Sequence, residues 1–178
     1  MNFSLDLSLP LLERTPRVVR SLLAGLAPDW TLSNYGPDTW SPHEVVGHLI
    51  HGEKTDWMPR ARLILEKGES QPFEPFDRSG HARLCREKTL AELLDLFETL
   101  RAENLKALRA MSLTSDDLAR KGLHPALGTV TLGELIATWV AHDLNHIAQV
   151  CKAMACQHKM AVGPWVQYLS ILAPPAPR

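Results

Sequence analysis

The sequence predicts an all-α protein, a four-helix bundle with two longer connections and a short C-terminal helix. Four long segments repeat apolar residues at the spacing of one helix face. Three of them open on a capping box, and no segment sustains the alternation of a β-strand. The chain has 178 residues, of which 45% are hydrophobic and 22% charged. We expect one domain over residues 1–178, in which residues 173–178 form a flexible tail.

The first predicted helix spans residues 16–26. Thr15 is placed to cap it, and Pro16 suits the first helical position, where a missing N–H costs nothing. Its apolar stripe consists of Val18, Val19, Leu22, Leu23 and Leu26. Pro10 and the leucines around it are expected to add an earlier turn.

The second predicted helix begins after Ser41, which is followed by a proline and, three positions on, by Glu44. This is the pattern of a capping box. Pro59 is expected to kink or end the helix, and residues 60–67 are expected to continue it at an angle. Residues 69–88 are predicted to form a long crossing loop. Its candidate anchors are Pro72, Phe73, Pro75 and Phe76.

Thr89 and Glu92 repeat the capping box and open the third predicted helix. Apolar residues recur on one side of this helix, and charged residues fill the other side. The connection that follows, residues 112–130, contains a short helical candidate over residues 116–120. Because no alternation of apolar and polar residues is sustained there, no strand is predicted.

A third capping box at Thr131 opens the fourth predicted helix, which is expected to run to about Cys156. A last short helix is predicted after Pro164. The side chains expected to face inward from it are those of Trp165, Leu169 and Leu172.

Charge, hydropathy and cysteine content disfavour a nucleic-acid-binding, a membrane-spanning or a secreted protein. Lysine and arginine number 19 against 20 aspartates and glutamates, so a protein that mainly grips nucleic acid is disfavoured. No apolar run approaches the roughly 20 residues that cross a bilayer, and the first residues lack the basic start of a secretory signal. The three cysteines are odd in number and form no CxxC pair, which favours a reducing cytoplasm.

His142 and His146 form the sharpest motif, a pair four residues apart on the fourth predicted helix. Such residues lie one turn above each other, with Cβ atoms about 5–6 Å apart. Both imidazoles can therefore face one ion at the zinc–nitrogen distance of about 2.0–2.1 Å. In a chain with 8 histidines, however, a pair of this spacing arises readily by chance. The alternative is two core histidines bonded to backbone or to carboxylates.

His48 is the natural third ligand, because it lies at the edge of the second helix's apolar face, beside the open space over Gly52. Three such imidazoles would leave one side of an ion open. Asp143 turns toward the middle of the apolar stripe, where a bare carboxylate is costly. It is expected either to accept a hydrogen bond from a ligating imidazole such as that of His48, or to bond a Trp or an Arg inside the bundle. The histidines expected at the surface are His43, His51, His81, His124 and His158.

Residues 40–50, which read WSPHEVVGHLI, are followed about ninety residues later by the HDLNH of residues 142–146. This arrangement resembles the DinB/YfiT-like superfamily over most of the chain, residues 16–172. The resemblance implies a four-helix bundle that holds a divalent ion, commonly zinc or nickel, through three histidines at one end. Carried over residue by residue, the metal ligands are His48, His142 and His146.

Members similar to this chain include thiol S-transferases that use bacillithiol or mycothiol, and a mycothiol-dependent maleylpyruvate isomerase. In the isomerase branch one ligand on a helix is Glu, where this chain has His. The resemblance also implies a homodimer formed through helix faces, and the aromatics that could lie at such an interface are Trp30, Trp165 and Tyr168.

The leading functional hypothesis is a metal-dependent transferase that activates a low-molecular-weight thiol for S-conjugation to a small-molecule substrate. No cysteine of the chain is placed as the nucleophile, so the thiol would be an external cofactor. One alternative is a metal-dependent hydrolase that uses a metal-bound water, although Asp143 stands where the zincins carry a longer Glu. The other is a non-catalytic, metal-stabilised stress-response or binding module. No catalytic residue is assigned.

Overall fold

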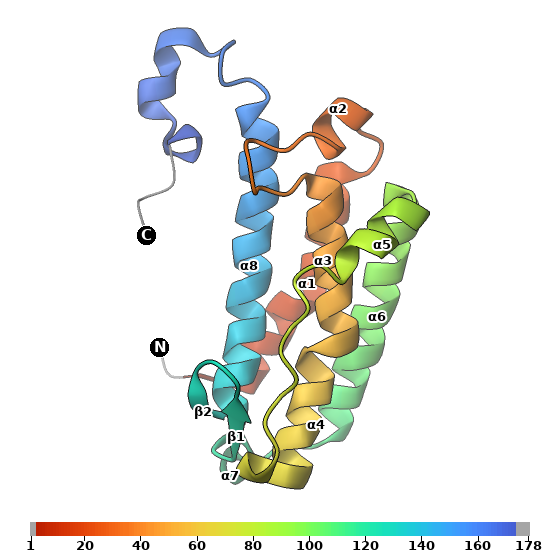
Figure 1. Cartoon of the computed structure of the whole chain (residues 1–178), viewed down its shortest axis with the longest axis vertical. Helices are drawn as coiled ribbons and strands as arrows, with labels where there is room; N and C mark the ends of the chain where they lie inside the picture. Colours follow the sequence, from red (N-terminus) through yellow and green to blue (C-terminus); the bar gives the residue numbers. More distant parts are fainter. Residues whose placement is uncertain (1–2, 174–178) are drawn as a thin grey trace.

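The computed structural model describes residues 3–173, and its long helices lie side by side in a bundle (Figure 1). The long elements are α1 (Leu5–Leu23), α3 (Pro42–Thr55), α4 (Trp57–Lys67), α6 (Leu90–Ala110) and α8 (Leu132–Cys156). The shorter elements are α2 (Pro28–Thr31), η1 (Gly68–Ser70), α5 (His81–Glu87), α7 (Ser115–Leu118), β1 (Lys121–His124), β2 (Gly128–Thr131), η2 (Gly163–Tyr168) and η3 (Ser170–Leu172). The predicted four-helix bundle is confirmed, with α3 and α4 together as its second member. Most of the predicted tail, residues 174–178, lies outside the described residues.

Capping boxes fix the starts of α3, α6 and α8 where the sequence predicts them. Ser41, Thr89 and Thr131 each accept a hydrogen bond from the backbone N–H three residues on. The glutamate at that position accepts in return from the N–H of the capping residue, at 2.7–2.8 Å. Each box thus satisfies two N–H groups that a helix start leaves without a partner.

The first helix is longer than predicted, since α1 starts at Leu5 and is capped by Ser4. Thr15, the predicted cap, lies inside the helix, where its hydroxyl donates to the carbonyl of Leu11 at 3.2 Å. The prediction was wrong because a proline in a helix interior usually ends the helix. Here the helix continues through both Pro10 and Pro16.

Pro16 is tolerated because a buried side chain replaces the hydrogen bond that it removes. A proline has no N–H for the carbonyl four residues earlier, which in this helix belongs to Leu12. Nη1 of Arg101, on α6, donates to that carbonyl oxygen at 2.7 Å. An unpaired carbonyl would be costly in the bundle interior, and this contact links α1 to the middle of the bundle.

The second helical unit breaks at Asp56 and not at Pro59. The backbone of Asp56 departs from helical angles, with φ −111° and ψ −72°, and α4 starts at the next residue. Pro59 therefore falls in the first turn of α4, where its missing N–H has no helical partner to lose. The predicted continuation over residues 60–67 is confirmed.

Both long connections contain structure that was not predicted. Residues 71–80 run as an extended strap beside α3 and lead into α5 (Figure 1). Near the end of the other connection, β1 and β2 pair as an antiparallel hairpin, with Lys121 opposite Thr131. Strands of four residues are too short to show the sustained alternation on which strand prediction depends. The backbone N–H of Phe73, in the strap, donates to the carbonyl of Leu123 in β1 at 2.9 Å, so strap and hairpin are joined.

Two apolar clusters fill the bundle, one on either side of a buried polar layer. The first contains Leu12, Trp57, Met58, Ala61, Ile64, Phe73, Leu105, Leu108, Leu132, Leu135, Ile136 and Trp139. The second contains Val19, Leu23, Val45, Val46, Leu49, Ile50, Leu93, Leu94, Phe97 and Val150. Among the described residues, no helix has both the length and the apolar character needed to cross a membrane.

The C-terminal segment faces the bundle less than predicted. Leu172 is buried, as expected, but Trp165 is 71% exposed and Leu169 is 38% exposed. The inward orientation predicted for these two residues is therefore wrong. The segment consists of short 3₁₀ turns, in which side chains recur every three residues and do not follow the period of an α-helix.

Candidate metal centre

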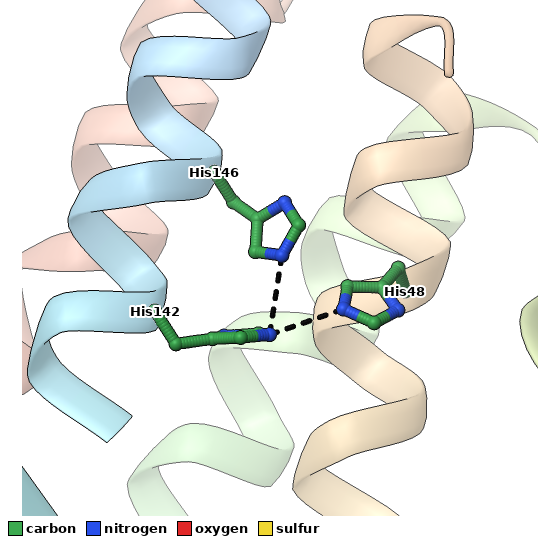
Figure 2. A group of neighbouring side chains, drawn as sticks. All are labelled: His48, His142 and His146. Carbon is green, nitrogen blue, oxygen red and sulfur yellow. Dashed lines mark hydrogen bonds between the residues drawn. The ribbon is translucent and has the colours of Figure 1, made fainter. Parts of the chain in front are cut away.

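Three imidazoles meet between α3 and α8 (Figure 2). His48 projects from α3, and His142 and His146 project from consecutive turns of α8. Nε2 of His142 lies 3.0 Å from Nε2 of His48 and 3.1 Å from Nε2 of His146. One nitrogen from each ring lies within 4.8 Å of the others. The structure thus brings together the three histidines that the sequence singled out, although His48 lies more than ninety residues before the other two in the chain.

The spacing of these nitrogens suits a common divalent ion. Two nitrogens that each lie 2.0–2.1 Å from zinc are about 3.3 Å apart in tetrahedral geometry, and about 2.9 Å apart at a right angle. The observed separations of 3.0 and 3.1 Å fall between these values. Two of the three pairs thus have the spacing of nitrogens bound to one ion, and the third pair, His48 and His146, lies within 4.8 Å.

Hydrogen bonds among the three rings cannot account for the cluster. Nδ1 of His146 lies 2.8 Å from Oε1 of Gln149, so this ring donates from Nδ1 and its Nε2 carries a lone pair. Nε2 of His142 cannot donate to His146 and accept from His48 at the same time, because a neutral ring nitrogen does only one of the two. An ion that takes one lone pair from each Nε2 removes this conflict.

Burial keeps all three rings neutral, which is the form that binds metal ions. Desolvation, followed by the neighbouring imidazoles, lowers the pKa of His48 to about 3. Desolvation in the same way lowers the pKa of His142 to about 3, and it also lowers the pKa of His146. At neutral pH each ring therefore offers a lone pair and carries no charge.

Aromatic side chains pack around the cluster and fix the orientation of its rings. Trp40 lies 4.6 Å from His48, measured between ring centroids, and Phe76 of the strap lies 5.5 Å from the same ring. Trp57, at the start of α4, lies 5.0 Å from His142 with its ring edge-on. The break between α3 and α4 therefore places an aromatic wall directly beside the three histidines.

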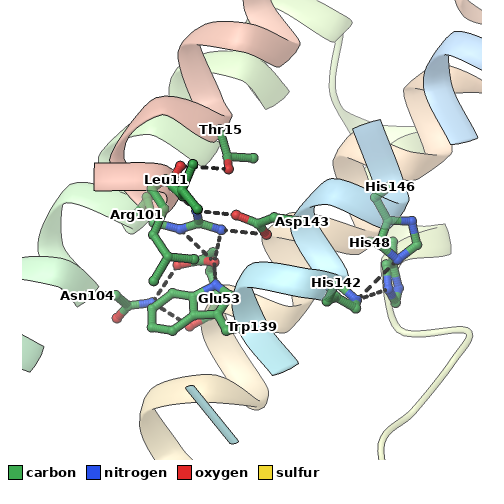
Figure 3. Close-up of polar contacts among 11 residues, drawn as sticks. Leu11, Thr15, His48, Glu53, Arg101, Asn104, Trp139, His142, Asp143 and His146 are labelled. Atoms are coloured by element: carbon green, nitrogen blue, oxygen red, sulfur yellow. Dashed lines mark hydrogen bonds and ion pairs between the residues drawn. The ribbon is translucent and has the colours of Figure 1, made fainter. Parts of the chain in front are cut away.

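Asp143 points away from the histidines and into the bundle (Figure 3). Its carboxylate accepts from Nη1 of Arg101 at 2.6 Å and from Nη2 at 3.0 Å. The expectation that it accepts from a ligating imidazole such as His48 is therefore wrong, and the alternative of an arginine partner is what the structure has. The reason is that position 143 lies about 100° around the helix from His142, which turns its side chain from α3 toward α6.

Arg101 is the centre of a buried network that joins the four long helical units (Figure 3). Nε and Nη2 donate to Oε1 of Glu53 on α3 at 3.0 and 2.8 Å. With Asp143 on α8 and the carbonyl of Leu12 on α1, every guanidinium N–H has a partner. Oε1 of Glu53 also accepts from Nε1 of Trp139 at 3.1 Å. One arginine thus faces two carboxylates, and desolvation raises the pKa of Glu53.

Sequence reasoning allowed an arginine partner for Asp143 but identified neither Arg101 nor Glu53, although one signal pointed to Arg101. Arg101 lies one helical turn from both Phe97 and Leu105, on the stripe of α6 that packs into the core. A charged residue within an apolar stripe indicates a buried ion pair. The stripe shows that a partner is needed, but the sequence cannot say that Glu53 and Asp143 supply it.

A cavity of about 780 Å³ lies beside the three histidines. It is bounded by α3, α4, the strap, the hairpin and the stretch of α8 from Glu134 to Gln149. Gly52, which was expected to leave space beside His48, lies on its wall. The aromatic residues that line it are Trp40, Trp57, Phe73 and Phe76. Its polar lining includes Asp56, Arg60, His124 and Gln149.

The remaining histidines are less exposed than predicted. His43 and His81 are 8% and 5% exposed, because α5 packs against α3. Cys85 of α5 covers His43, and His81, the first residue of α5, packs against Trp40. His124 lies on the cavity wall, where the hairpin places it, and His51 is half-buried. Only His158 among these five is exposed as expected.

None of the cysteines lines the cavity. Cys85 lies between α5 and α3, where burial raises the pKa of its thiol to about 11. Cys151 and Cys156 lie in the last turns of α8, beyond the histidines, and all three are free thiols. The chain therefore presents no thiolate of its own to the three imidazoles.

The chain is similar to known proteins along most of its length. It is 27% identical over 146 residues to a curated protein of Oceanobacillus iheyensis named "Putative metal-dependent hydrolase OB0782", a match that covers 79% of this chain and 82% of the relative. Its structure resembles that of YfiT from Bacillus subtilis, with a TM-score of 0.72 and 22% identity over 88% of this chain and 87% of that one. YfiT is described as "a probable metal-dependent hydrolase with an unusual four-helix bundle topology". At this level of identity, the likeness to YfiT bears on the fold alone.

The sequence profile of the DinB superfamily matches residues 11–150. This stretch is well over half of the chain, and it includes all three clustered histidines as well as Arg101 and its partners. The chain belongs to the DinB superfamily.

Proposed function

We propose that this protein is a metal-dependent transferase that activates a low-molecular-weight thiol for attack on a small electrophilic substrate. His48, His142 and His146 would hold the divalent ion, zinc or nickel. The observation that carries the proposal is the convergence of three neutral imidazoles beside a cavity with aromatic walls. Imidazole suits both metals, and three ligands leave a coordination position free.

The protein's own groups would contribute binding and exclusion of water. A divalent ion at this position supplies a Lewis acid that lowers the pKa of a thiol or water bound to it. Because the three rings are neutral, they leave the double charge of such an ion uncompensated. Trp40 and Phe76 cover His48, and they would shield the reacting atoms from bulk water while the substrate's apolar part lies against them.

The position of Asp143 favours a thiol over water as the nucleophile. In zincins the carboxylate that follows the first histidine is the general base, but here both carboxylate oxygens accept from Arg101. A free thiol has a pKa of about 8.5 and bulk water one of 15.7, so a thiol needs less help to ionise. Since no cysteine lines the cavity, the thiol would be an external cofactor.

Hydrolysis by a water that the ion activates is the second candidate. It is supported by the names of the Oceanobacillus protein and of YfiT, both of which refer to a metal-dependent hydrolase. In that reaction the ion itself would have to lower the pKa of the water, because the carboxylate nearest the ligands along the chain is bonded to arginine.

Metal content is the first test. Purified protein is expected to hold about one divalent ion per chain by elemental analysis, and single replacement of His48, His142 or His146 by Ala should remove it. His158→Ala is the matched control, because His158 is exposed and lies outside the cavity. Retention of the metal in all three ligand variants would disprove the assignment.

Activity separates the two candidates. Metal-loaded protein would be assayed with bacillithiol or mycothiol and a chlorinated aromatic substrate, and separately with esters or amides in the absence of thiol. We expect conjugation that requires both thiol and metal and is lost in His142→Ala. Ester or amide cleavage without thiol would favour the hydrolase. If removal of the metal lowers the melting temperature and neither reaction is seen, the ion serves stability alone.

We also propose that the protein works as a homodimer. Trp165 and Tyr168 are 71% and 74% exposed on the C-terminal segment, as is typical of aromatic residues at an interface. Trp30 is half-buried and packs on His158 at 5.0 Å, so it contributes less exposed surface. Sedimentation of the protein and of Trp165→Ser would test this: a monomeric parent protein would refute it.

A further inference from the structure

We propose that Arg60 and His124 form a recognition site for an oxygen acceptor on the substrate, a carboxylate or a carbonyl, in the cavity that the three clustered histidines also line. The apolar part of the substrate would lie against the aromatic walls between them. This inference rests on the proposed function, because it assumes that the molecule bound in the cavity is a substrate. The two residues come from α4 and β1, so neither belongs to the metal-binding cluster.

The hairpin fixes which nitrogen of His124 carries the proton. Nδ1 of His124 accepts from the backbone N–H groups of Ala126 and Leu127, at 3.1 and 3.2 Å. A ring nitrogen that accepts holds no proton, so Nε2 of the neutral ring is an N–H donor. Burial and the nearby Arg60 lower the pKa of His124, which keeps the ring neutral. Nε2 has no hydrogen-bond partner among residues 3–173, and the residue lines the cavity.

Arg60 presents further donors on the same wall. Its Nε forms an ion pair with Oδ1 of Asp56 at 2.6 Å, and one Nη2 proton goes to the carbonyl of Glu74 in the strap at 3.2 Å. The guanidinium lies over the ring of Phe73, 5.1 Å from its centroid, a cation–π contact that helps to position it. Its remaining N–H groups have no acceptor within the described part of the chain, although the side chain is only 11% exposed.

The N–H groups of Arg60 and His124 favour a ligand that carries a hydrogen-bond acceptor. The charges of Arg60 and Asp56 compensate each other, and His124 is neutral, so attraction comes from directed N–H groups more than from net charge. A half-buried donor without a partner gains most from an oxygen acceptor, because little water competes for it. A purely apolar ligand would leave these donors unpaired.

Two substitutions of His124 distinguish the loss of its Nε2 donor from the loss of its contacts within the hairpin. In His124→Asn the side-chain oxygen takes the place of Nδ1 and keeps the contacts to Ala126 and Leu127, while the Nε2 donor is lost. In His124→Gln an N–H group reaches the place of Nε2, while the contacts to the turn are lost. His158→Asn is the same change at an exposed site outside the cavity. Melting temperatures of all variants would show that the fold persists.

The probes are phenylacetate and phenylacetamide, which share an aromatic ring and differ in carrying a carboxylate or a neutral carbonyl. Their dissociation constants would be measured by NMR titration of the metal-loaded protein. We expect His124→Asn to weaken binding of the preferred probe about tenfold or more, and His124→Gln and His158→Asn to change it less than threefold. The tighter probe identifies whether a carboxylate or a carbonyl is recognised.

The same titration on His142→Ala distinguishes this inference from the metal proposal. If the probes bind at Arg60 and His124, their affinity should persist when the ligand cluster is disrupted. Affinity that is lost in His142→Ala and unchanged in His124→Asn would mean that the probes bind at the ion, and it would overturn the inference. Absence of saturable binding by either probe would also overturn it, whereas the metal analysis would stand.

Discussion

Replacing Arg101 with methionine is expected to destabilise the protein more than any surface substitution. Arg101, Glu53 and Asp143 are each 2% exposed or less, measured on their side chains. Methionine fills much of the same volume but leaves two buried carboxylates without a cation, and breaking such a pair costs about 3–5 kcal/mol. It also leaves the carbonyl of Leu12 without its donor, which adds about 1–3 kcal/mol. We therefore expect a loss of about 4–8 kcal/mol, against a typical total of 5–15 kcal/mol.

Urea unfolding followed by circular dichroism at neutral pH would measure this loss. Arg109→Met is the matched control on the same helix, because Arg109 pairs with Glu13 at the surface, where the side chains are 45% and 48% exposed. An exposed pair contributes about 0–1 kcal/mol. If Arg101→Met fell within about 1 kcal/mol of the Arg109 control, the proposed role of the network would be refuted.

A second variant keeps this test informative if Arg101→Met does not fold. Combining Arg101→Met with Glu53→Gln and Asp143→Asn removes the buried charges together with their partner. Replacing a whole buried ionic group is often nearly neutral, so the triple variant should recover a large part of the lost stability. A triple variant no more stable than Arg101→Met would show that packing, not uncompensated charge, explains the loss.

Three further predictions concern α1, acid stability and helix capping. Pro16→Ala should raise the free energy of unfolding by less than about 1 kcal/mol, not the roughly 3 kcal/mol usual for proline inside a helix, because Leu12 already has a donor; urea unfolding measures this. In metal-free protein the pKa of His48 and of His142 is about 3 in the folded state and about 6.5 in the unfolded state. Between these two pH values the unfolded chain therefore binds more protons than the folded protein. Stability should therefore fall as pH drops below about 6.5, by up to about 1.4 kcal/mol per unit for each histidine, and His142→Ala should weaken the dependence. Ser41→Ala should cost about 1 kcal/mol in thermal or urea unfolding, because it removes the acceptor of the capping box.

The helix starts and the candidate ligands could be predicted because the interactions behind them are local. A capping box joins residues three apart, and two histidines four apart share a helix face whatever the rest of the chain does. For the same reason α8 was predicted from Thr131 to Cys156 without knowledge of its neighbours. The predicted start of α1 was less accurate, because the bond that lets the helix continue through Pro16 comes from Arg101, 85 positions further along the chain.

The assembly of the three histidines and of the buried network depends on contacts between residues distant in the chain. Only packing of the helices creates these contacts. His48 meets His142 because α3 and α8 are neighbours. Asp143 meets Arg101 across the middle of the bundle, because α6 and α8 both pack against α1 and α3. His124 was predicted at the surface, yet the hairpin turns it onto the cavity wall. The sequence by itself determined which residues share a helix face. Which faces meet depends on burying the apolar area of the whole chain at once, a condition that no short stretch of residues contains.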